Sequence, residues 1–203
     1  MYMNYQVVFD EILKKISGVP KLLLHACCAP CSSYCLEYLS NFFEITVFFY
    51  NPNMDKEEEF NKRFTELERF IHEFKGNNPI HLVCPKYNHD EFLNISKGLE
   101  QEPERGKRCL KCYRLRLEES FKYAKEHNFD YITTTLTLSP YKNSVVINEI
   151  GKELEEKYSF KYLYSDFKKK DGYKRSIVLS REYHLYRQNY CGCEFSKKVN
   201  FIN

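Results

Sequence analysis

Seven of the nine cysteines in this 203-residue chain lie in three short groups. The groups are Cys27-Cys28-x-x-Cys31, Cys109-x-x-Cys112 and Cys191-x-Cys193. Two thiolates at such spacing can bind one metal ion, and a helix that begins at a CxxC pair favours negative sulfur at its positive end. Three such groups in one chain predict a metal site rather than scattered structural cysteines.

The number of cysteines bears on the kind of metal. One tetrahedral zinc ion or one cubane iron–sulfur cluster takes four thiolates, and the excess predicts a cluster plus a second metal with an open position. Two alternatives stay open, namely a structural zinc site and free cysteines that fill core space. For Cys35 and Cys84, which stand outside the three groups, core filling is the expected role.

The first cysteine group follows an apolar run at residues 21–26, which predicts a buried strand of a parallel sheet. Pro30 should end that strand, and Ser32 and Ser33 are expected to cap a helix running to about Ser40. In an open α/β sheet such a turn lies at the carboxyl ends of the strands, where ligands bind. It contains no glycine, which favours a metal over a nucleotide phosphate.

Strands and helices alternate along the rest of the chain, which predicts a doubly wound α/β fold with a mostly parallel sheet. Residues 1–203 show no linker or repeat and are expected to form a single metal-binding catalytic domain. Further strands are expected at residues 45–50, 80–83, 131–136 and 161–164. Helices are expected at residues 5–16, from a capping box at Asp55 and Glu58 through Phe74, at about 90–97, from Cys109 through Ala124, from Val146 through Leu154, and at about 180–190.

Composition limits the compartment and the partners. No apolar signal-peptide core precedes the first strand, and the longest apolar stretch, residues 45–50, is too short to cross a bilayer. The chain is therefore expected in the cytoplasm, without a membrane, where disulfides are rare. The net charge of +3 neither demands nor excludes nucleic acid.

Basic and aromatic residues cluster late in the chain, in a pattern typical of RNA binding, because cations bind phosphates and rings stack on unpaired bases. A solvated basic surface is the alternative. The RNA-binding candidates are Lys168, Lys169, Lys170, Tyr173, Lys174, Arg175, Arg181 and Arg187. A second set of cations flanks the CxxC pair: Arg105, Lys107, Arg108, Arg114 and Arg116. His25, inside the first strand, is expected to be a hydrogen-bonded core histidine rather than a metal ligand.

Five segments between residues 22 and 196 together resemble the QueH-type epoxyqueuosine reductases: LLLHACCAPCSS, RCLKCYRLRLEES, TTTLTLSPYKN, DFKKKDGYKRSIVLS and YRQNYCGCEFS. The resemblance implies an α/β fold related to the adenine-nucleotide α-hydrolase (HUP) superfamily. It implies reduction of the epoxide of epoxyqueuosine at the tRNA wobble position to give queuosine. It also implies a 4Fe–4S cluster, a nearby mononuclear metal expected to be iron, and two partners, a tRNA anticodon stem-loop and an electron donor.

The resemblance carries the metal-binding role to six cysteines: Cys27, Cys28, Cys109, Cys112, Cys191 and Cys193. Some relatives have Asp where this chain has Cys31, so Cys31 is predicted either as a catalytic ligand of the second metal or as a bystander. The chemistry agrees with these residues, since a cluster supplies electrons one at a time and an iron with a free position acts as a Lewis acid on an epoxide oxygen.

Two rival functions remain at this point. An iron–sulfur tRNA sulfurtransferase of the ATP-pyrophosphatase-related type would need a phosphate loop rich in serine and glycine after the first strand, and residues 27–33 do not provide one. A non-enzymatic zinc-binding RNA module would be colourless and contain zinc alone.

Overall fold

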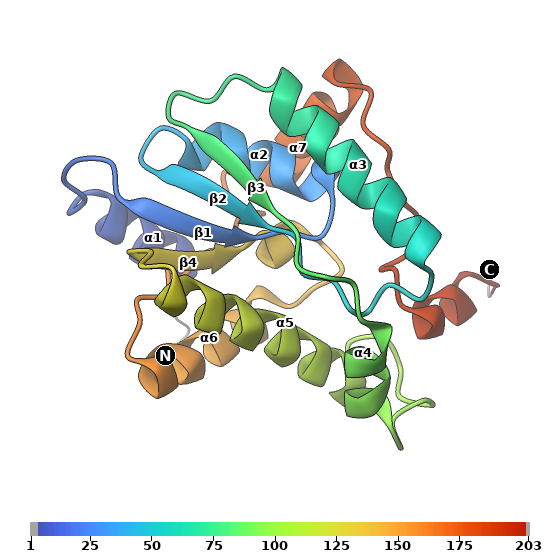
Figure 1. The fold of residues 1–203 in the computed structure, drawn as a ribbon. Helices are drawn as coiled ribbons and strands as arrows, with labels where there is room; N and C mark the ends of the chain where they lie inside the picture. The colour runs from blue at the N-terminus through green and yellow to red at the C-terminus, as the bar shows by residue number, and fades with distance from the viewer. Residues whose placement is uncertain (1–3, 202–203) are drawn as a thin grey trace.

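The computed structural model describes the backbone of residues 4–201 and the side chains of residues 4–197. Helices and strands alternate along it as predicted (Figure 1). None of the helices within these residues is long and apolar enough to span a bilayer. The elements in chain order are α1 (Tyr5–Leu13), β1 (Lys21–His25), α2 (Ala29–Leu39), β2 (Glu44–Phe48), α3 (Glu57–Glu73), β3 (Ile80–Val83), α4 (His89–Ser96), α5 (Lys107–Glu126), β4 (Tyr131–Thr134), the 3₁₀ helix η1 (Thr135–Leu138), α6 (Ser144–Tyr158), α7 (Gly172–Glu182) and the 3₁₀ helix η2 (Glu194–Phe201).

The four strands form one parallel sheet in the order β3-β2-β1-β4. Its central strand β1 is buried on both faces, as its continuous apolar run predicts. Leu22 and Leu24 belong to the core that also contains side chains of α1, α2 and α3, whereas Leu23 belongs to the core beneath α5 and α6. Helices thus cover both faces (Figure 1), which confirms the doubly wound α/β fold. A relation to the HUP superfamily stays a prediction.

The strand expected at residues 161–164 is reduced to one parallel bridge between Ile132 and Tyr162. Two backbone hydrogen bonds form it, from the Ile132 amide to the Lys161 carbonyl at 3.1 Å and from the Leu163 amide to the Ile132 carbonyl at 2.8 Å. The Leu163 carbonyl, which a longer parallel ladder would pair with the next amide of β4, accepts instead from Thr133 Oγ1 at 2.8 Å. The prediction of a full fifth strand was therefore wrong, because a side chain replaces the next bond of the ladder.

The start of α2 also differs from the prediction, since Cys28 is its N-cap and Pro30 lies in its first turn. Proline suits this position because the first amides of a helix have no intrahelical acceptor. The Ser32 hydroxyl donates to the Cys28 carbonyl at 2.8 Å and the Ser33 hydroxyl to the Pro30 carbonyl at 2.9 Å. Both serines therefore lie inside the helix, and the prediction that they cap it was wrong.

The capping box expected at Asp55 and Glu58 is absent from the described residues as well. The N-cap of α3 is Lys56, whose side chain makes no capping hydrogen bond. Asp55 instead accepts a hydrogen bond from Lys197 Nζ at 2.5 Å. The carboxylate that the local sequence pattern predicted as a helix cap thus pairs with a lysine that is distant in sequence.

The helix expected at about residues 180–190 was misplaced, because α7 ends at Glu182 and residues 183–193 follow as a non-helical segment. Tyr183, Tyr186 and Tyr190 have helical spacing, but they lie along α3. They contact three of its side chains: Phe70, Lys62 and Arg63. The helical spacing of these tyrosines therefore accompanies packing against α3 and does not form a helix of their own.

Candidate metal centre

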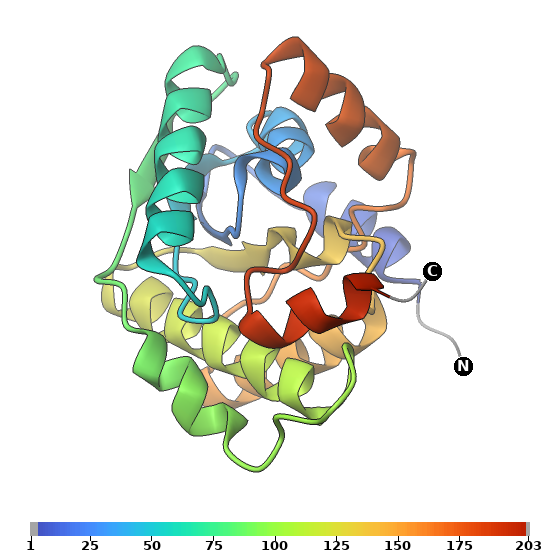
Figure 2. The ribbon, with the colours of Figure 1, turned by 90° about the vertical axis from the view of Figure 1, so that its right-hand side faces the viewer.

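The cysteine groups meet at the carboxyl end of the sheet. β1 and β4 are neighbours, although the chain leaves β1 toward β2 and returns to β4 from the opposite side. Ligands of open α/β sheets bind at such a reversal of strand order. The first cysteine group follows β1, the loop of residues 139–143 follows η1, and the segment before η2 crosses this end of the sheet (Figure 2).

The first group, Cys27, Cys28 and Cys31, is called the cysteine trio below. Its three Sγ atoms lie within 4.8 Å of one another, and Cys27 Sγ is 3.8 Å from Cys28 Sγ. The end of β1 supplies the first thiol, the N-cap of α2 the second and its first turn the third. Three convergent thiols of this kind can bind one metal ion.

Hydrogen bonds within the trio separate the acidities of its thiols. Bonds with Cys28 and Cys31 hold the pKa of Cys27 well below its usual value, and the charges of Lys142 and Arg116 lower it further. The bond with Cys27 raises the pKa of Cys28 to about 11 and also raises that of Cys31. The trio thus favours one thiolate, at Cys27, even before a metal replaces the protons.

The remaining four cysteines, called the cysteine quartet, come from both ends of the C-terminal half: Cys109, Cys112, Cys191 and Cys193. Cys109 lies in the first turn of α5, and Cys112 packs with Cys193 in a small buried cluster. Burial raises the pKa of Cys112 to about 12 and that of Cys193 to about 11, and the charge of Cys191 adds to both. The same charge acts on Cys109, so the quartet lies within mutual electrostatic reach.

Arg63 and Gly192 position the Cys191 end of the quartet. The guanidinium of Arg63, which is 1% exposed, donates to the Cys191 carbonyl at 3.3 Å and to the Tyr190 carbonyl at 3.4 Å. Gly192 adopts φ +107°, a conformation that other residues rarely adopt. Its carbonyl accepts from the Asp55 amide at 3.0 Å. A buried arginine of α3 therefore holds a cysteine more than a hundred residues away.

Arg116 places a positive charge between the trio and the quartet. Its side chain is buried and donates to Asn51 Oδ1 at 2.5 Å and to His25 Nε2 at 3.3 Å. Among the side chains that the structure describes, no carboxylate forms an ion pair with it. A buried cation without a counter-charge is costly, and the thiols of Cys112, Cys27 and Cys191 lie within its electrostatic reach.

Lys142 adds a second cation to the same region. Burial alone would lower the pKa of Lys142, but the negative charges of Cys191 and Cys27 raise it above the usual value. The amine therefore stays protonated beside both cysteine groups. Seven thiols together with two inward-facing cations fit an anionic metal–thiolate group, so the donor set agrees with the predicted metal centre.

A cavity of about 380 Å³ connects the two cysteine groups. Cys27 and Cys31 line it from the trio and Cys191 from the quartet. Two cations that sequence reasoning did not select for this site, Arg63 and Lys142, line it too. A volume of this size falls in the range of small-ligand pockets, about 300–1,000 Å³, so one nucleoside-sized group can reach the cysteines.

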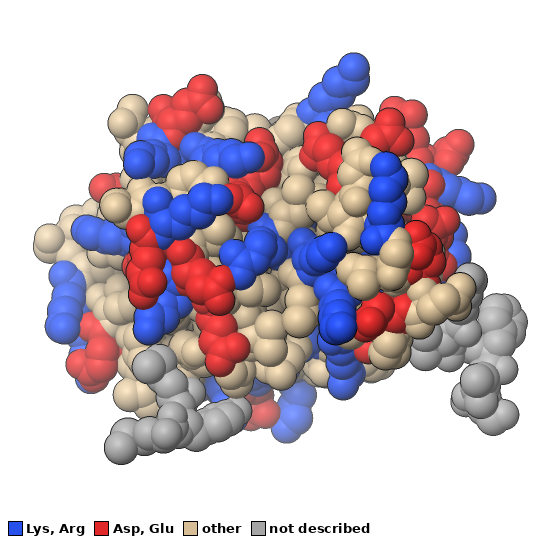
Figure 3. All heavy atoms as spheres, turned by 90° about the horizontal axis from the view of Figure 1, so that it is seen from below, with Lys and Arg blue, Asp and Glu red and all other residues tan. Residues whose placement is uncertain are grey.

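The predicted RNA-binding residues divide into three sets. Tyr173 and Arg187 line the cavity, and Lys169 and Arg181 are exposed. The other four pair with carboxylates: Lys168 with Asp166, Lys170 with Asp10, Lys174 with Asp171, and Arg175 with Glu37. Charges are also interspersed on the α5–α6 side of the molecule (Figure 3). The RNA-binding role of these residues stays a prediction, with Tyr173 and Arg187 best placed for it.

Two of the cations that flank the CxxC pair face inward. Arg108 is buried and donates to the carbonyls of Leu99, Glu100 and Glu102, and Arg116 is buried and lines the cysteine cavity. A contact of either residue with RNA phosphate stays a prediction.

His25 and the two isolated cysteines behave as core residues. His25 Nδ1 lies 2.8 Å from Thr134 Oγ1, and burial lowers the pKa of the ring to about 3. Cys35 is buried in the core beneath α2, and Cys84 packs against the edge of the same core. The packing roles predicted for these three residues are confirmed.

Fold and site together define an α/β protein with a thiolate-rich centre at the reversal of its parallel sheet. Comparison with known proteins agrees with this class and narrows it. The family described as "Epoxyqueuosine reductase QueH" matches residues 22–199. The chain therefore belongs to the epoxyqueuosine reductase family, as its motifs predicted.

Proteins that carry this family name are similar over most of their length. The protein of Streptococcus pyogenes is 40% identical, with 98% of this chain and 82% of that protein aligned. The protein of Staphylococcus epidermidis is 41% identical over 95% of this chain and 86% of its own. The more distant protein of Thermotoga maritima is 34% identical over 86% and 89%.

Proposed function

We propose that this chain reduces the epoxide of epoxyqueuosine in tRNA to the alkene of queuosine. The reaction consumes two electrons and two protons, breaks both carbon–oxygen bonds of the epoxide, forms a carbon–carbon double bond and releases water. The observation that carries the proposal is that Cys27 and Cys31 of the trio and Cys191 of the quartet line one cavity, in a chain of this family. The reaction class is oxidoreduction.

The two cysteine groups are proposed to bind two different metals. The quartet offers the four thiolates that a 4Fe–4S cluster takes, and the trio offers a site for a single metal, expected to be iron, with a position left for substrate. When bound, the cluster would supply electrons singly and the second metal would supply Lewis acidity. Cys31 has the second-metal role in this assignment.

The chain's own residues would orient the substrate and balance charge. Lys142 and Arg116 keep positive charge beside the thiolates, which favours ligands in their deprotonated form. Tyr173 and Arg187 line the same cavity and are proposed to contact the anticodon loop by stacking and phosphate binding. The exposed Lys169 and Arg181, and the paired Lys168, Lys170, Lys174 and Arg175, are proposed as weaker, outer contacts.

The remaining partners follow from the chemistry. The electrons must come from a donor protein or small reductant, which we propose as a second partner. The cytoplasm is the proposed compartment because it keeps cysteines reduced. Membership of the reductase family disfavours the sulfurtransferase alternative.

Metal content and turnover test the proposal together. Protein purified without oxygen should be brown, contain about four cluster irons and about one further iron, and convert epoxyqueuosine in an anticodon stem-loop when an artificial reductant is added. Cys112→Ala should bleach the cluster, and Cys84→Ala, outside both groups, should not. A colourless protein with stoichiometric zinc and no turnover would contradict the proposed reductase function and favour the hypothesis of a zinc-binding RNA module.

A further inference from the structure

A second cavity, of about 320 Å³, adjoins the cysteine cavity. The two cavities share Pro140 and Lys142 in their linings, so Lys142 stands between them. Of the residues that the sequence analysis singled out, Arg105, one of the cations flanking the CxxC pair, lines the second cavity. Its lining residues are Arg105, Leu110, Tyr113, Pro140, Lys142, Asn143 and Val146.

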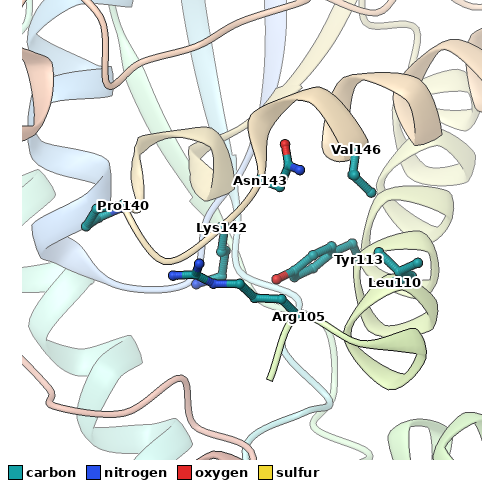
Figure 4. A pocket seen from close by; sticks show the side chains of 7 residues that line it. All are labelled: Arg105, Leu110, Tyr113, Pro140, Lys142, Asn143 and Val146. Carbon is teal, nitrogen blue, oxygen red and sulfur yellow. The ribbon is translucent and has the colours of Figure 1, made fainter. Parts of the chain in front are cut away.

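The second cavity has one polar and one apolar side. In Figure 4 the Arg105 guanidinium, the Lys142 side chain and the Tyr113 hydroxyl lie on one side, and Leu110 and Val146 lie on the other. Cations and a hydroxyl donor suit a phosphate, and an aliphatic wall suits the flat face of a base. This combination is typical of a site for one nucleotide rather than for a metal or a peptide.

Arg105 is more available than Lys174 and Arg175 of α7, which pair with carboxylates. Arg105 Nε donates to the Tyr141 carbonyl at 2.9 Å, which orients the guanidinium and leaves its terminal nitrogens for a ligand. No carboxylate among the described side chains forms an ion pair with Arg105. Tyr141 lies in sequence between Pro140 and Lys142, the two residues that line both cavities, and it is 64% exposed. This edge of the molecule therefore presents an oriented, unneutralised cation beside an exposed ring.

We propose that the second cavity binds the nucleotide adjacent to the modified one in the anticodon loop. The modified nucleoside occupies the cysteine cavity, and the phosphate that joins the two lies at Arg105 and Lys142. This inference rests on the proposed function for the identity of the first nucleoside. The volume of the second cavity is at the low end of the range for ligand pockets, so the cavity can hold one nucleotide rather than a longer stretch of RNA. The RNA thus extends from the cysteine cavity to the α5–α6 side, in addition to the contacts proposed for residues on and beside α7.

Competition binding tests this subsite. The metal-loaded protein is titrated with a labelled anticodon stem-loop, which is then displaced by three ligands: the epoxyqueuosine nucleoside and the two dinucleotides that join it to its 5′ or its 3′ neighbour. One of the dinucleotides should bind at least about tenfold more tightly than the nucleoside, because a charged hydrogen bond contributes about 1.5–3 kcal/mol.

Three variants separate the subsite from general effects. Arg105→Gln removes the charge and keeps the Arg105 amide, which donates to Cys109 Sγ at 3.3 Å. Val146→Trp fills the apolar side. Each should reduce the dinucleotide's advantage about tenfold and leave the nucleoside's affinity unchanged. Lys152→Gln removes one charge from a residue of α6 that lines neither cavity and should change neither affinity.

Each other outcome overturns the subsite. These outcomes are equal affinity of the nucleoside and both dinucleotides for the parent protein, no displacement by any of the three ligands, and equal losses for nucleoside and dinucleotide in both cavity variants. Turnover measured on the same samples tests the proposed function separately. A parent protein that reduces the epoxide without preferring a dinucleotide contradicts only the subsite, and one that prefers a dinucleotide without turnover contradicts only the reaction.

Discussion

Arg116 offers the sharpest test of the view that the core of this site is built for an anionic metal centre. Arg116→Met keeps a long, flexible side chain of similar reach but removes the guanidinium. In the parent protein that group is 1% exposed and bonds to Asn51 and His25. The guanidinium also lies within hydrogen-bonding and electrostatic reach of the Cys112 sulfur, which would be a thiolate in the metal-loaded protein.

The expected magnitude follows from the contacts that are lost. One charge-assisted hydrogen bond to a thiolate is worth about 1.5–3 kcal/mol, which corresponds to about 10–100-fold in metal affinity. The bonds to Asn51 and His25 are lost with or without metal. The variant should therefore release cluster iron to a chelator about 10–100-fold more readily, beyond any loss of stability seen in the metal-free protein.

Two measurements separate these effects. Anaerobic iron transfer to a chelator reports metal affinity, and urea unfolding of the reduced, metal-free protein reports the fold. Arg114→Met is the matched control, because Arg114 lies on the same helix, is 42% exposed in its side chain and pairs with Glu153. It should change the free energy of unfolding by less than about 1 kcal/mol and leave iron release unchanged. Equal iron release from Arg116→Met and the parent protein would refute the reasoning.

Three further predictions address other parts of the molecule. Cys31→Asp should keep the cluster spectrum and much of the activity, because iron accepts oxygen ligands, whereas Cys31→Ala should keep the spectrum but lose the second metal and turnover; full activity in Cys31→Ala, measured on an anticodon stem-loop, would make Cys31 a bystander. Changing Lys169 and Lys170 together to Glu should weaken tRNA binding and lower the slope of log affinity against log salt by about one per lost phosphate contact; fluorescence titrations that return the parent slope would place the RNA elsewhere. Gly151→Ala should lower the free energy of unfolding by about 1–3 kcal/mol, because the new Cβ would lie 2.3 Å from the Tyr162 ring; unfolding at the parent's urea midpoint would show that the ring moves aside at no cost.

The features that the sequence determined are those encoded over short distances. The apolar run of β1, the turn that follows it and the trio in that turn lie within about a dozen residues, so side-chain type and spacing suffice to place them. The alternation of strands and helices then leaves few topologies with all strands parallel. For the same reason Cys35 and His25 were recognised as core residues from their positions in a buried helix and strand.

Only the tertiary structure decided what balances and positions the thiols. Arg63 is an ordinary helical cation in sequence, yet its helix packs so that the guanidinium reaches the Cys191 carbonyl. Arg116 looks like part of a basic surface but faces inward, since the register of α5 turns it toward the sheet. Lys170 was predicted as an RNA contact, and only the structure shows that it also pairs with Asp10, from the other end of the chain. These partners are determined by proximity in three dimensions, and the spacing of residues along the chain contains no information about it. The sequence therefore showed which residues are charged, but not which charges pair.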